Sequence, residues 1–215
     1  LATLYHDDVM DEAPLRRGVE SANKRWGNSV AILTGDYLFA KSSLLLAELG
    51  PDAVRHQAMT FERLVVGQIM ETEGPQDSEE PLTHYLKVVA EKTGSLFGLC
   101  ARYGGYLSGA KAEIVETLVA FSEELGIAFQ LADDVIDIES SSNQSGKTPG
   151  TDLREGVPTL VTLLVQRMNR PEDARLLSLL AGAITSESEV TFALEQLRIH
   201  PALDEAKKIT MQYAE

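Results

Sequence analysis

The residues best suited to chemistry are six aspartates in two copies of one pattern, Asp-Asp-x-x-Asp. The copies are DDVMD, with Asp7, Asp8 and Asp11, and DDVID, with Asp133, Asp134 and Asp137. On a helix the first and last aspartates of each copy face the same way, because residues four apart share a helix face. Two like charges at that spacing destabilise a helix by about 0.2 to 0.5 kcal/mol. Each pair therefore favours a bound cation or open water.

Magnesium suits these aspartate pairs, since Mg²⁺ prefers oxygen ligands and commonly joins one or two carboxylates to substrate phosphates. One such cluster in a chain with 33 Asp and Glu residues would more simply be a solvated helix face. The second copy and its apolar flanks, AFQLADDVIDI, argue against that alternative. Arg16 and Arg17, in APLRRG, add guanidinium groups that suit bidentate phosphate contacts. Together the clusters predict a magnesium-assisted diphosphate site.

Helices are expected to carry both clusters. Apolar residues recur at three and four positions through most of the chain, and alternating runs bounded by hairpin dipeptides are missing. The chain is therefore expected to be all-α and to form a single domain over residues 1–215. A loop that is either functional or disordered is expected over residues 140–156. The expected helices cover residues 1–12, 28–49, 53–73, 82–108, 112–138, 157–169, 171–184, 188–199 and 201–214.

Composition narrows the classes of function. The net charge of -14 argues against binding to nucleic acid, which needs a basic patch. Apolar stretches are broken by polar or charged residues before the ~20 residues needed to span a bilayer, so no transmembrane segment is expected. A basic and apolar leader is also missing, which makes the cytoplasm the expected location. Cys100, the only cysteine, lies in an apolar run that predicts a buried, unreactive thiol.

Five motifs follow one another along the chain: HDDVMDEAPLRRG, GDYLFA, AEKTGSLF, FQLADDVIDI and GKTPGTDLREG. In this order and spacing they closely resemble the trans-isoprenyl (polyprenyl) diphosphate synthase family, in particular its long-chain type, from Leu1 to about Leu164. The resemblance implies an all-α isoprenoid synthase-type helical bundle around a central hydrophobic cavity. It also implies a prenyltransferase that extends an allylic diphosphate with isopentenyl diphosphate. The steps would be Mg²⁺-assisted ionisation, condensation and proton elimination, giving a trans-polyprenyl diphosphate.

The resemblance also implies roles for individual residues. Asp7, Asp11 and Asp133 would bind about three Mg²⁺ ions shared with the substrate, and the other three aspartates would support them. Arg16 would contact the allylic diphosphate, and Arg17 the diphosphate of isopentenyl diphosphate. The remaining contacts of the allylic site would be Lys92, Thr93, Gln130 and Lys147.

These contacts also have ordinary structural explanations. Lys92 and Lys147 could simply be solvent-exposed, whereas the resemblance implies that they stabilise the leaving diphosphate. Thr93 could cap a helical turn, and Gln130 could satisfy a backbone group. Lys147 gains most from its context, because it lies in the Gly-containing loop directly after the second cluster, where a loop can close over phosphate.

Product length is expected to depend on small residues one turn before the first cluster. If Asp7 points at the diphosphate, Thr3 lies one turn earlier on the same face, with Ala2 beside it. Family members with short products tend to carry large aromatic side chains here, so a product longer than about fifteen carbons is expected, and the resemblance favours about thirty to fifty. Alternatively, Tyr5 could be the side chain that stops the growing product, at a deeper position. Alternatively, Ala2 and Thr3 simply allow close helix packing.

Some family features lie outside this sequence. Members carry a Gly-Lys-x-x-Arg motif and a histidine for isopentenyl diphosphate well before the first cluster, whereas Leu1 is only six residues from Asp7. Either an N-terminal helical segment is omitted here, or the chain is a fragment that should bind isopentenyl diphosphate poorly. The usual C-terminal part also extends beyond Glu215.

Two other functions compete with chain elongation. A class I terpene cyclase shares the fold and the ionisation step, but its second metal site usually mixes Asn or Asp with Ser, Thr and Glu, whereas DDVID is a complete acidic cluster. A noncatalytic partner subunit of a prenyl synthase typically lacks one cluster, and both are intact here. The resemblance further implies a homodimer.

Overall fold

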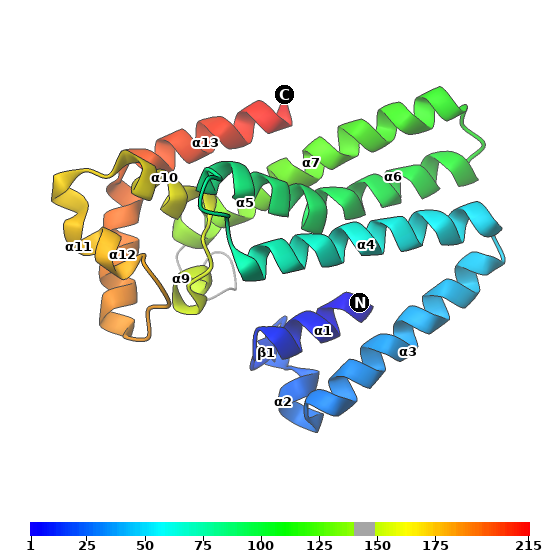
Figure 1. Ribbon diagram of the computed structural model, residues 1–215, viewed down its shortest axis with the longest axis horizontal. Coiled ribbons are helices and arrows are strands. Elements are labelled where there is room, and N and C mark those ends of the chain that lie inside the picture. The colour runs from blue at the N-terminus through cyan, green and yellow to red at the C-terminus, as the bar shows by residue number, and fades with distance from the viewer. Residues whose placement is uncertain (140–148) are drawn as a thin grey trace. The chain divides into compact units, whose positions relative to one another are not determined.

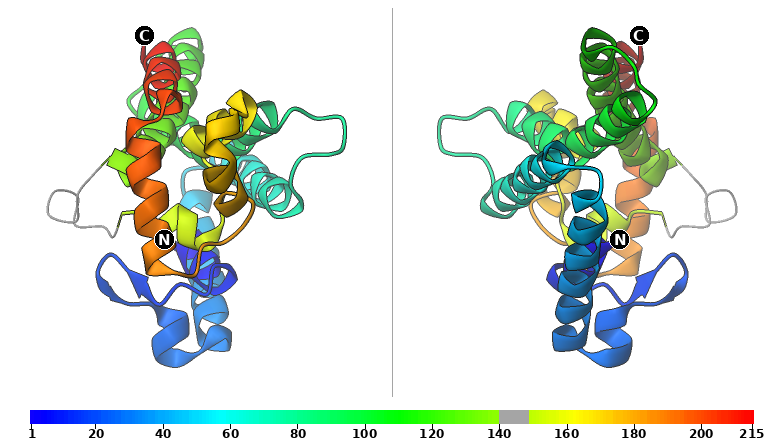
Figure 2. Two further views of the ribbon diagram at one scale, coloured as in Figure 1. Left: turned by 90° about the vertical axis from the view of Figure 1, so that its left-hand side faces the viewer. Right: turned by 90° about the vertical axis from the view of Figure 1, so that its right-hand side faces the viewer.

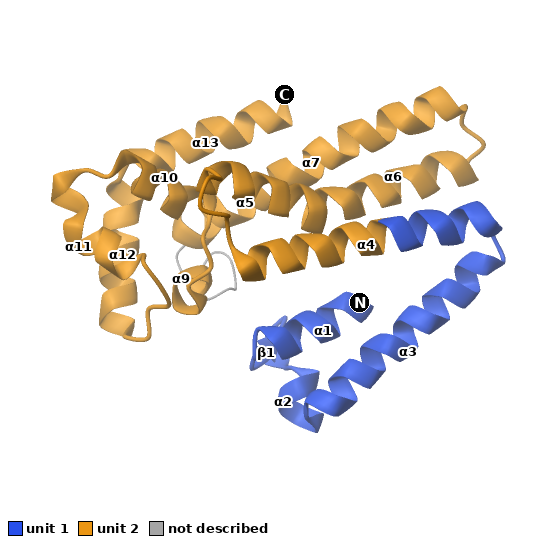
Figure 3. Ribbon diagram, viewed as in Figure 1, with its two compact units in different colours: residues 1–59 blue, residues 60–215 orange. Residues whose placement is uncertain are grey.

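The computed structural model describes residues 1–139 and 149–215, and helices dominate this part of the chain (Figure 1). The all-α expectation is thus confirmed. The chain divides into two compact units, Leu1–Met59 and Thr60–Glu215 (Figure 3). The boundary falls within helix α4 (Pro51–Glu73), which contributes its first nine residues to the first unit. The single domain over residues 1–215 stays a prediction.

The first unit is built on the packing of helix α1 (Ala2–Met10) against helix α3 (Asn28–Ala47). The contact is close because Gly35 has no side chain: a Cβ there would lie 2.4 Å from Nε2 of His6. That ring nitrogen lies 3.1 Å from the carbonyl oxygen of Ile32 and 3.3 Å from a carboxylate oxygen of Asp36. His6, the residue before the first aspartate cluster, therefore fixes α1 on α3.

A short hairpin in the first unit is an exception to the helical structure expected from the sequence. Strand β1 (Leu15–Arg16) pairs antiparallel with strand β2 (Val19–Glu20). The two turn residues, Arg17 and Gly18, have φ angles of 53° and 79°, and glycine adopts that left-handed region at little cost. Strands of two residues are too short to show an alternating pattern. Helix α2 (Ala22–Trp26) follows the hairpin.

The second unit contains the main core. Helix α7 (Ala112–Glu139) runs beside α6 (Ser95–Leu107) and α13 (Pro201–Ala214) (Figures 1 and 2). Helix α5 (Pro81–Val89) continues through a π-helical segment, η1 (Ala90–Gly94), into α6, and Figure 2 shows the chain looping outward before α5. The largest fully buried side chains of this core include Leu131, Ile138, Leu160, Leu164 and Leu197. The remaining elements are α9 (Thr151–Glu155), α10 (Leu160–Met168), η2 (Pro171–Asp173), α11 (Ala174–Leu179) and α12 (Glu187–Ile199).

Two proline-marked corners of the second unit are tied together by a buried network. Arg170 donates to Asp173 from Nε and Nη2, at 2.7 and 2.8 Å. Nδ1 of His200 accepts from the backbone N–H of Ala202, so its Nε2 donates to Asp173, at 2.9 Å. Asp173 therefore joins the start of η2 to the start of α13. Its pKa lies below the usual range, chiefly because Arg170 donates to the carboxylate, with His200 adding to the effect.

Asp173→Asn is expected to destabilise the protein by about 1 to 3 kcal/mol at neutral pH, since hydrogen bonds to a charged carboxylate are lost. Because the folded-state pKa is lowered, this stabilisation is complete above the unfolded-state pKa of about 3.9 and is lost as the pH falls further. Urea unfolding at several pH values should thus give a difference from wild type that shrinks below about pH 4. A difference that stays constant down to pH 3 would contradict the assignment.

One expectation about burial needs correction, and the expectation about membrane-spanning segments stays a prediction. Cys100, expected to be buried, is exposed on α6. Among the described residues, α3 is long and apolar enough by length and composition to cross a membrane, although no such segment was expected. One such helix is weak evidence, because the core helix of a soluble protein passes the same test. Within α3 the buried residues are Ala31 and Gly35.

Candidate active site

The first aspartate cluster lies at the C-terminal end of α1. The backbone N–H of Asp11 donates to the carbonyl oxygen of Asp7 at 2.8 Å, so these aspartates lie one helical turn apart, as the sequence indicates. Asp7 is half-buried and Asp11 is exposed, whereas Asp8 is only 4% exposed. The cluster therefore has two sides, with Asp8 pointing into the protein.

Asp8 holds Arg16 of the hairpin. Its Oδ1 accepts hydrogen bonds from Nε and Nη2 of Arg16 at 2.7 and 2.5 Å, and its backbone carbonyl oxygen accepts from the side chain of Asn23 at 2.9 Å. The hydrogen bond with Asp8 is the main cause that raises the pKa of Arg16, and the charges of Asp7 and Asp11 add to it. Arg16 is thus fixed beside the cluster as a permanent cation.

The other predicted residues of the first unit lie at different places around the cluster. Arg17 is exposed in the turn of the hairpin. Ala2, Thr3 and Tyr5 are half-buried on α1. The carbonyl oxygen of Ala2 would lie 3.0 Å from a Cβ at Gly35, so this end of α1 also packs closely on α3. That contact supports the packing explanation for Ala2 without testing a role in product length.

The second cluster, on α7, repeats the two-sided arrangement. Asp134 is 4% exposed and accepts hydrogen bonds from the hydroxyl of Tyr85, from Nε2 of Gln130 at 3.2 Å and from the backbone N–H of Leu160 at 3.1 Å. Leu160 is the first residue of α10, where backbone N–H groups lack partners within the helix. Burial raises the pKa of Asp134 to about 6 despite these donors. Asp134 therefore connects α7 with α5 and α10.

The outer aspartates of this cluster lie near a further acidic residue that the sequence analysis did not single out. Asp133 and Asp137 are half-buried, and Oδ1 of Asp137 lies 3.4 Å from the backbone nitrogen of Thr151, which donates to it. Asp152, on α9, has its pKa raised to about 8, first by burial and then by the charges of Asp137 and Asp134. Asp152 could have been found from the sequence, because it lies in the motif GKTPGTDLREG that follows the second cluster. Such a concentration of carboxylates fits a divalent cation.

Lys92 and Thr93 lie on the π-helical segment η1 and reach different partners. The ammonium group of Lys92 donates to Oε2 of Glu71 on α4, an ion pair that sequence reasoning missed because α4 has no recognisable acidic motif. Oγ1 of Thr93 donates to Oε1 of Gln130 at 3.2 Å. Since Gln130 also donates to Asp134, a chain of hydrogen bonds joins η1 to the second cluster.

Two predictions, the role of Lys147 and the binding of magnesium, are not seen directly in the structure. Lys147 lies outside the described residues. Within residues 1–139 and 149–215, no three His, Cys, Asp or Glu side chains are close enough together to hold one metal ion. Magnesium ordinarily takes only one or two protein carboxylates and completes its shell with water and phosphate oxygens. The donors present, all carboxylate oxygens, fit that pattern.

These helices and the two aspartate clusters define an isoprenoid synthase-type protein, and the chain belongs to the polyprenyl synthetase family, whose model matches residues 1–197. It is similar to nonaprenyl diphosphate synthase of Mycobacterium tuberculosis, with 55% identity over 214 residues, covering 100% of this chain and 64% of the relative. It is also similar to dimethylallyltranstransferase of the same organism, with 40% identity over 100% of this chain and 65% of that protein.

Solved structures share the fold. The structure of geranylgeranyl pyrophosphate synthase from Corynebacterium glutamicum, complexed with calcium and isoprenyl diphosphate, matches with a TM-score of 0.84 and 45% identity. It covers 99% of this chain, and this chain covers 64% of it. Polyprenyl synthase from Caulobacter crescentus, also complexed with calcium and isoprenyl diphosphate, matches with a TM-score of 0.87, 31% identity and coverages of 99% and 66%. The chain thus spans just under two thirds of the length of these relatives.

Proposed function

We propose that the protein containing this chain is a trans-polyprenyl diphosphate synthase. The observation that carries the proposal is the family match over residues 1–197, which includes both aspartate clusters in full. The 55% identity with a nonaprenyl diphosphate synthase supports chain elongation over cyclisation. The substrates would be an allylic diphosphate and isopentenyl diphosphate.

In the proposed reaction, the bond between the allylic carbon and the diphosphate oxygen breaks, and the alkene of isopentenyl diphosphate attacks the resulting cation. A proton then passes to the released diphosphate, the acceptor that family resemblance implies, and this gives an allylic diphosphate longer by one isoprene unit. Bound Mg²⁺, about three ions by family resemblance, would supply Lewis-acid stabilisation of the leaving diphosphate. Asp7, Asp11 and Asp133 would hold these ions.

Other side chains of the chain would bind and orient the substrates. Arg16, fixed by Asp8, would present its remaining N–H groups to the allylic diphosphate. Lys92 and Thr93 on η1 would add donors to the leaving group, where charge develops in the transition state. Gln130 would orient Thr93 through their hydrogen bond. Arg17, in the exposed turn, would reach the second diphosphate.

The location and assembly of the protein belong to the same proposal. The enzyme would act in the cytoplasm, and family resemblance implies a homodimer. The decisive experiment measures diphosphate release by the full-length protein from an allylic substrate, with and without isopentenyl diphosphate. Release that requires isopentenyl diphosphate and gives longer prenyl diphosphates supports elongation. Release without isopentenyl diphosphate would indicate a cyclase, and no release would indicate a noncatalytic subunit.

Thr3→Phe is expected to shorten the products while leaving the first condensation nearly unimpaired. If the growing chain passes along the face of α1 that carries Asp7, a phenyl ring one turn away blocks further elongation, because a packed interior cannot easily relax around it. Mass spectrometry of products from the full-length enzyme measures the effect.

Thr3→Ala is the matched control, since it removes volume at the same position and should leave the products at least as long as those of wild type. If Thr3→Phe and wild type give the same product distribution, the chain does not grow along this face. The assignment of Ala2, Thr3 and Tyr5 to product length would then be wrong.

A further inference from the structure

The residues proposed to contact the leaving diphosphate sit on an unusual piece of helix. Lys92 and Thr93 belong to η1, a π-helical segment inserted between α5 and α6. One π-helical turn inside a longer helix carries an extra residue, costs regular hydrogen bonding and occurs frequently at functional sites. Such a segment needs neighbours that fix its conformation.

Helix α4 supplies one of these neighbours through a single stripe of residues. Arg63, Gly67 and Glu71 are spaced by four and therefore share one face of α4. Arg63 donates to Glu91 at 2.9 and 3.2 Å, and Glu71 accepts from Lys92. Between them, a Cβ at Gly67 would lie 2.9 Å from side-chain atoms of both Glu91 and Lys92.

The order of charges on this stripe fixes how η1 sits on α4. The consecutive residues Glu91 and Lys92 carry opposite charges and meet a cation and an anion at opposite ends of the stripe. A shift of η1 along α4 would separate both pairs and bring its backbone against a different part of the stripe. The close approach at Gly67 allows little such movement.

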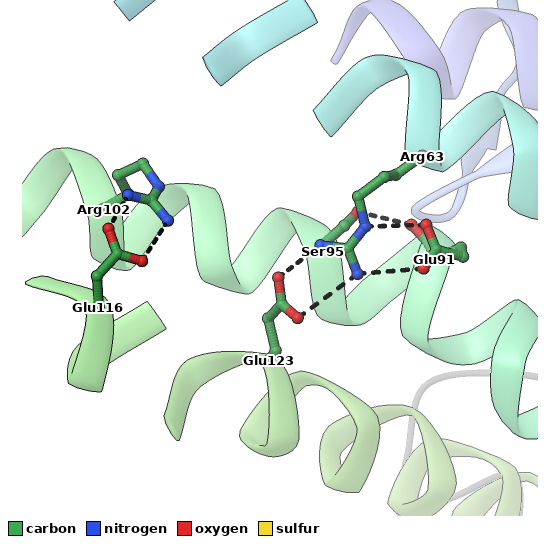
Figure 4. A network of polar contacts seen from close by, with 6 residues as sticks. All are labelled: Arg63, Glu91, Ser95, Arg102, Glu116 and Glu123. Carbon is green, nitrogen blue, oxygen red and sulfur yellow. Dashed lines mark hydrogen bonds and ion pairs between the residues drawn. The ribbon is translucent and has the colours of Figure 1, made fainter. Parts of the chain in front are cut away.

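Arg63 also reaches a third element. Its Nη1 donates to Glu123 on α7 at 2.6 Å, so one guanidinium group bridges α4, η1 and α7 (Figure 4). The side chains of Glu91 and Glu123 are 28% and 32% exposed. Without Arg63, these two half-buried carboxylates would repel each other across the contact between η1 and α7.

We propose that Arg63 is a positioning residue, which fixes η1 against α4 and α7 and thereby sets where Lys92 and Thr93 meet the leaving diphosphate. This role rests on the proposed function, in which Lys92 and Thr93 contact the leaving diphosphate. In this role Arg63 would contact the donors' segment and not the substrate or the metal. Its contribution is to hold the donors in place before ionisation begins.

A second ion pair in the same unit provides a matched control. Arg102 on α6 also forms a forked pair, since its Nη1 and Nη2 donate to the two carboxylate oxygens of Glu116 on α7 at 2.6 and 2.9 Å (Figure 4). Arg102 lies seven residues beyond Ser95, about two helical turns along α6 from η1. It therefore shares the α6 to α7 contact without touching the segment that carries Lys92.

The test compares Arg63→Gln, Arg63→Lys and Arg102→Gln in the full-length protein. Arg63→Gln should lower kcat for the first condensation by about 30- to 100-fold, because misplacement by about 1 Å costs rates of this order, while KM for isopentenyl diphosphate changes less than about twofold. Arg63→Lys should give a kcat between those of Arg63→Gln and wild type, because lysine keeps the charge but lacks the forked guanidinium group. Arg102→Gln should stay within about twofold of wild type in both constants.

Amide hydrogen exchange gives a readout that does not depend on activity. Exchange at residues 90–95 should accelerate in Arg63→Gln and stay unchanged in Arg102→Gln. Unchanged exchange there, or an equal loss of kcat in both variants, would overturn the role of Arg63. If wild type itself makes no prenyl diphosphate, the proposed function fails, and the exchange comparison still decides whether Arg63 orders η1.

Discussion

Asp7→Ala and Asp133→Ala are each expected to lower kcat for prenyl transfer by about three orders of magnitude or more while leaving the helical fold intact. Each removes a proposed metal ligand, and the leaving diphosphate then loses the electrostatic stabilisation on which ionisation depends. Removing an outer aspartate also relieves repulsion within its cluster, which favours retention of the helical fold. Steady-state kinetics at saturating Mg²⁺, with circular dichroism of the same samples, measures both effects.

Asp204→Ala is the control for these variants, since Asp204 is an exposed carboxylate on α13, distant in sequence from both clusters. It should behave as wild type. Excess chelator should abolish wild-type turnover, and added Mg²⁺ should restore it. Turnover that persists in chelator, or near-normal rates in both aspartate variants, would show that the clusters do not hold a catalytic metal.

Lys92→Ala is expected to lower kcat by about 100- to 1,000-fold with a smaller effect on KM, whereas Arg17→Ala should chiefly raise KM for isopentenyl diphosphate. The difference follows from the proposed partners of the two side chains. Lys92 would stabilise charge that develops only in the transition state, while Arg17 would bind a diphosphate that stays unchanged during the reaction. Kinetics with each substrate varied separately distinguishes the two defects.

Lys87→Ala is the matched lysine control, because Lys87 is on α5, one turn before η1, and pairs with Glu79 in an exposed position. It should leave both constants close to wild type. The same kinetic defect in Lys92→Ala and Arg17→Ala would mean that the two residues do not bind different diphosphates. Wild-type kcat and KM in Lys92→Ala would indicate that Lys92 pairs with Glu71 alone and does not contact the diphosphate.

Much of the helical fold follows from the spacing of apolar residues and from proline and glycine punctuation. The expected helix over residues 201–214 corresponds to α13, and that over 112–138 corresponds to α7 within one residue. Prolines at the first position of α5 and α13 mark their beginnings, because proline lacks the N–H that has no partner there. Long amphipathic segments with clear ends are thus readable from sequence.

Shorter or irregular features could not be read in this way. Helix α9 has five residues between Gly150 and Gly156, too few for a helical period to emerge. The π-helical segment η1 lies within one continuous expected helix, because apolar spacing does not distinguish an extra residue in one turn. The role of Arg63 could not be predicted from the sequence, because its partners are 28 and 60 residues away along the chain.

The sequence indicates how the aspartates of each cluster are arranged on their helix, but not which side chains they contact. The outer aspartates of the first cluster lie one turn apart, as expected from helical spacing. The inward direction of Asp8 and Asp134 could have been anticipated, because a residue one position along a helix points about 100° away from its neighbour. Their partners, Arg16 and Tyr85, depend on tertiary packing that spacing alone does not specify.

The two-sided form of each cluster places different evolutionary constraints on neighbouring aspartates. Asp8 and Asp134 serve the fold, since loss of Asp134 would leave the buried N–H of Leu160 without its acceptor and loss of Asp8 would leave Arg16 without its carboxylate partner. The outer aspartates place like charges close together, and the proposed metal binding adds a constraint from activity to the contacts that they make in the fold. A lineage that abandoned catalysis would therefore lose one of the constraints on the outer aspartates, while the constraint that the fold places on the middle ones would stay unchanged.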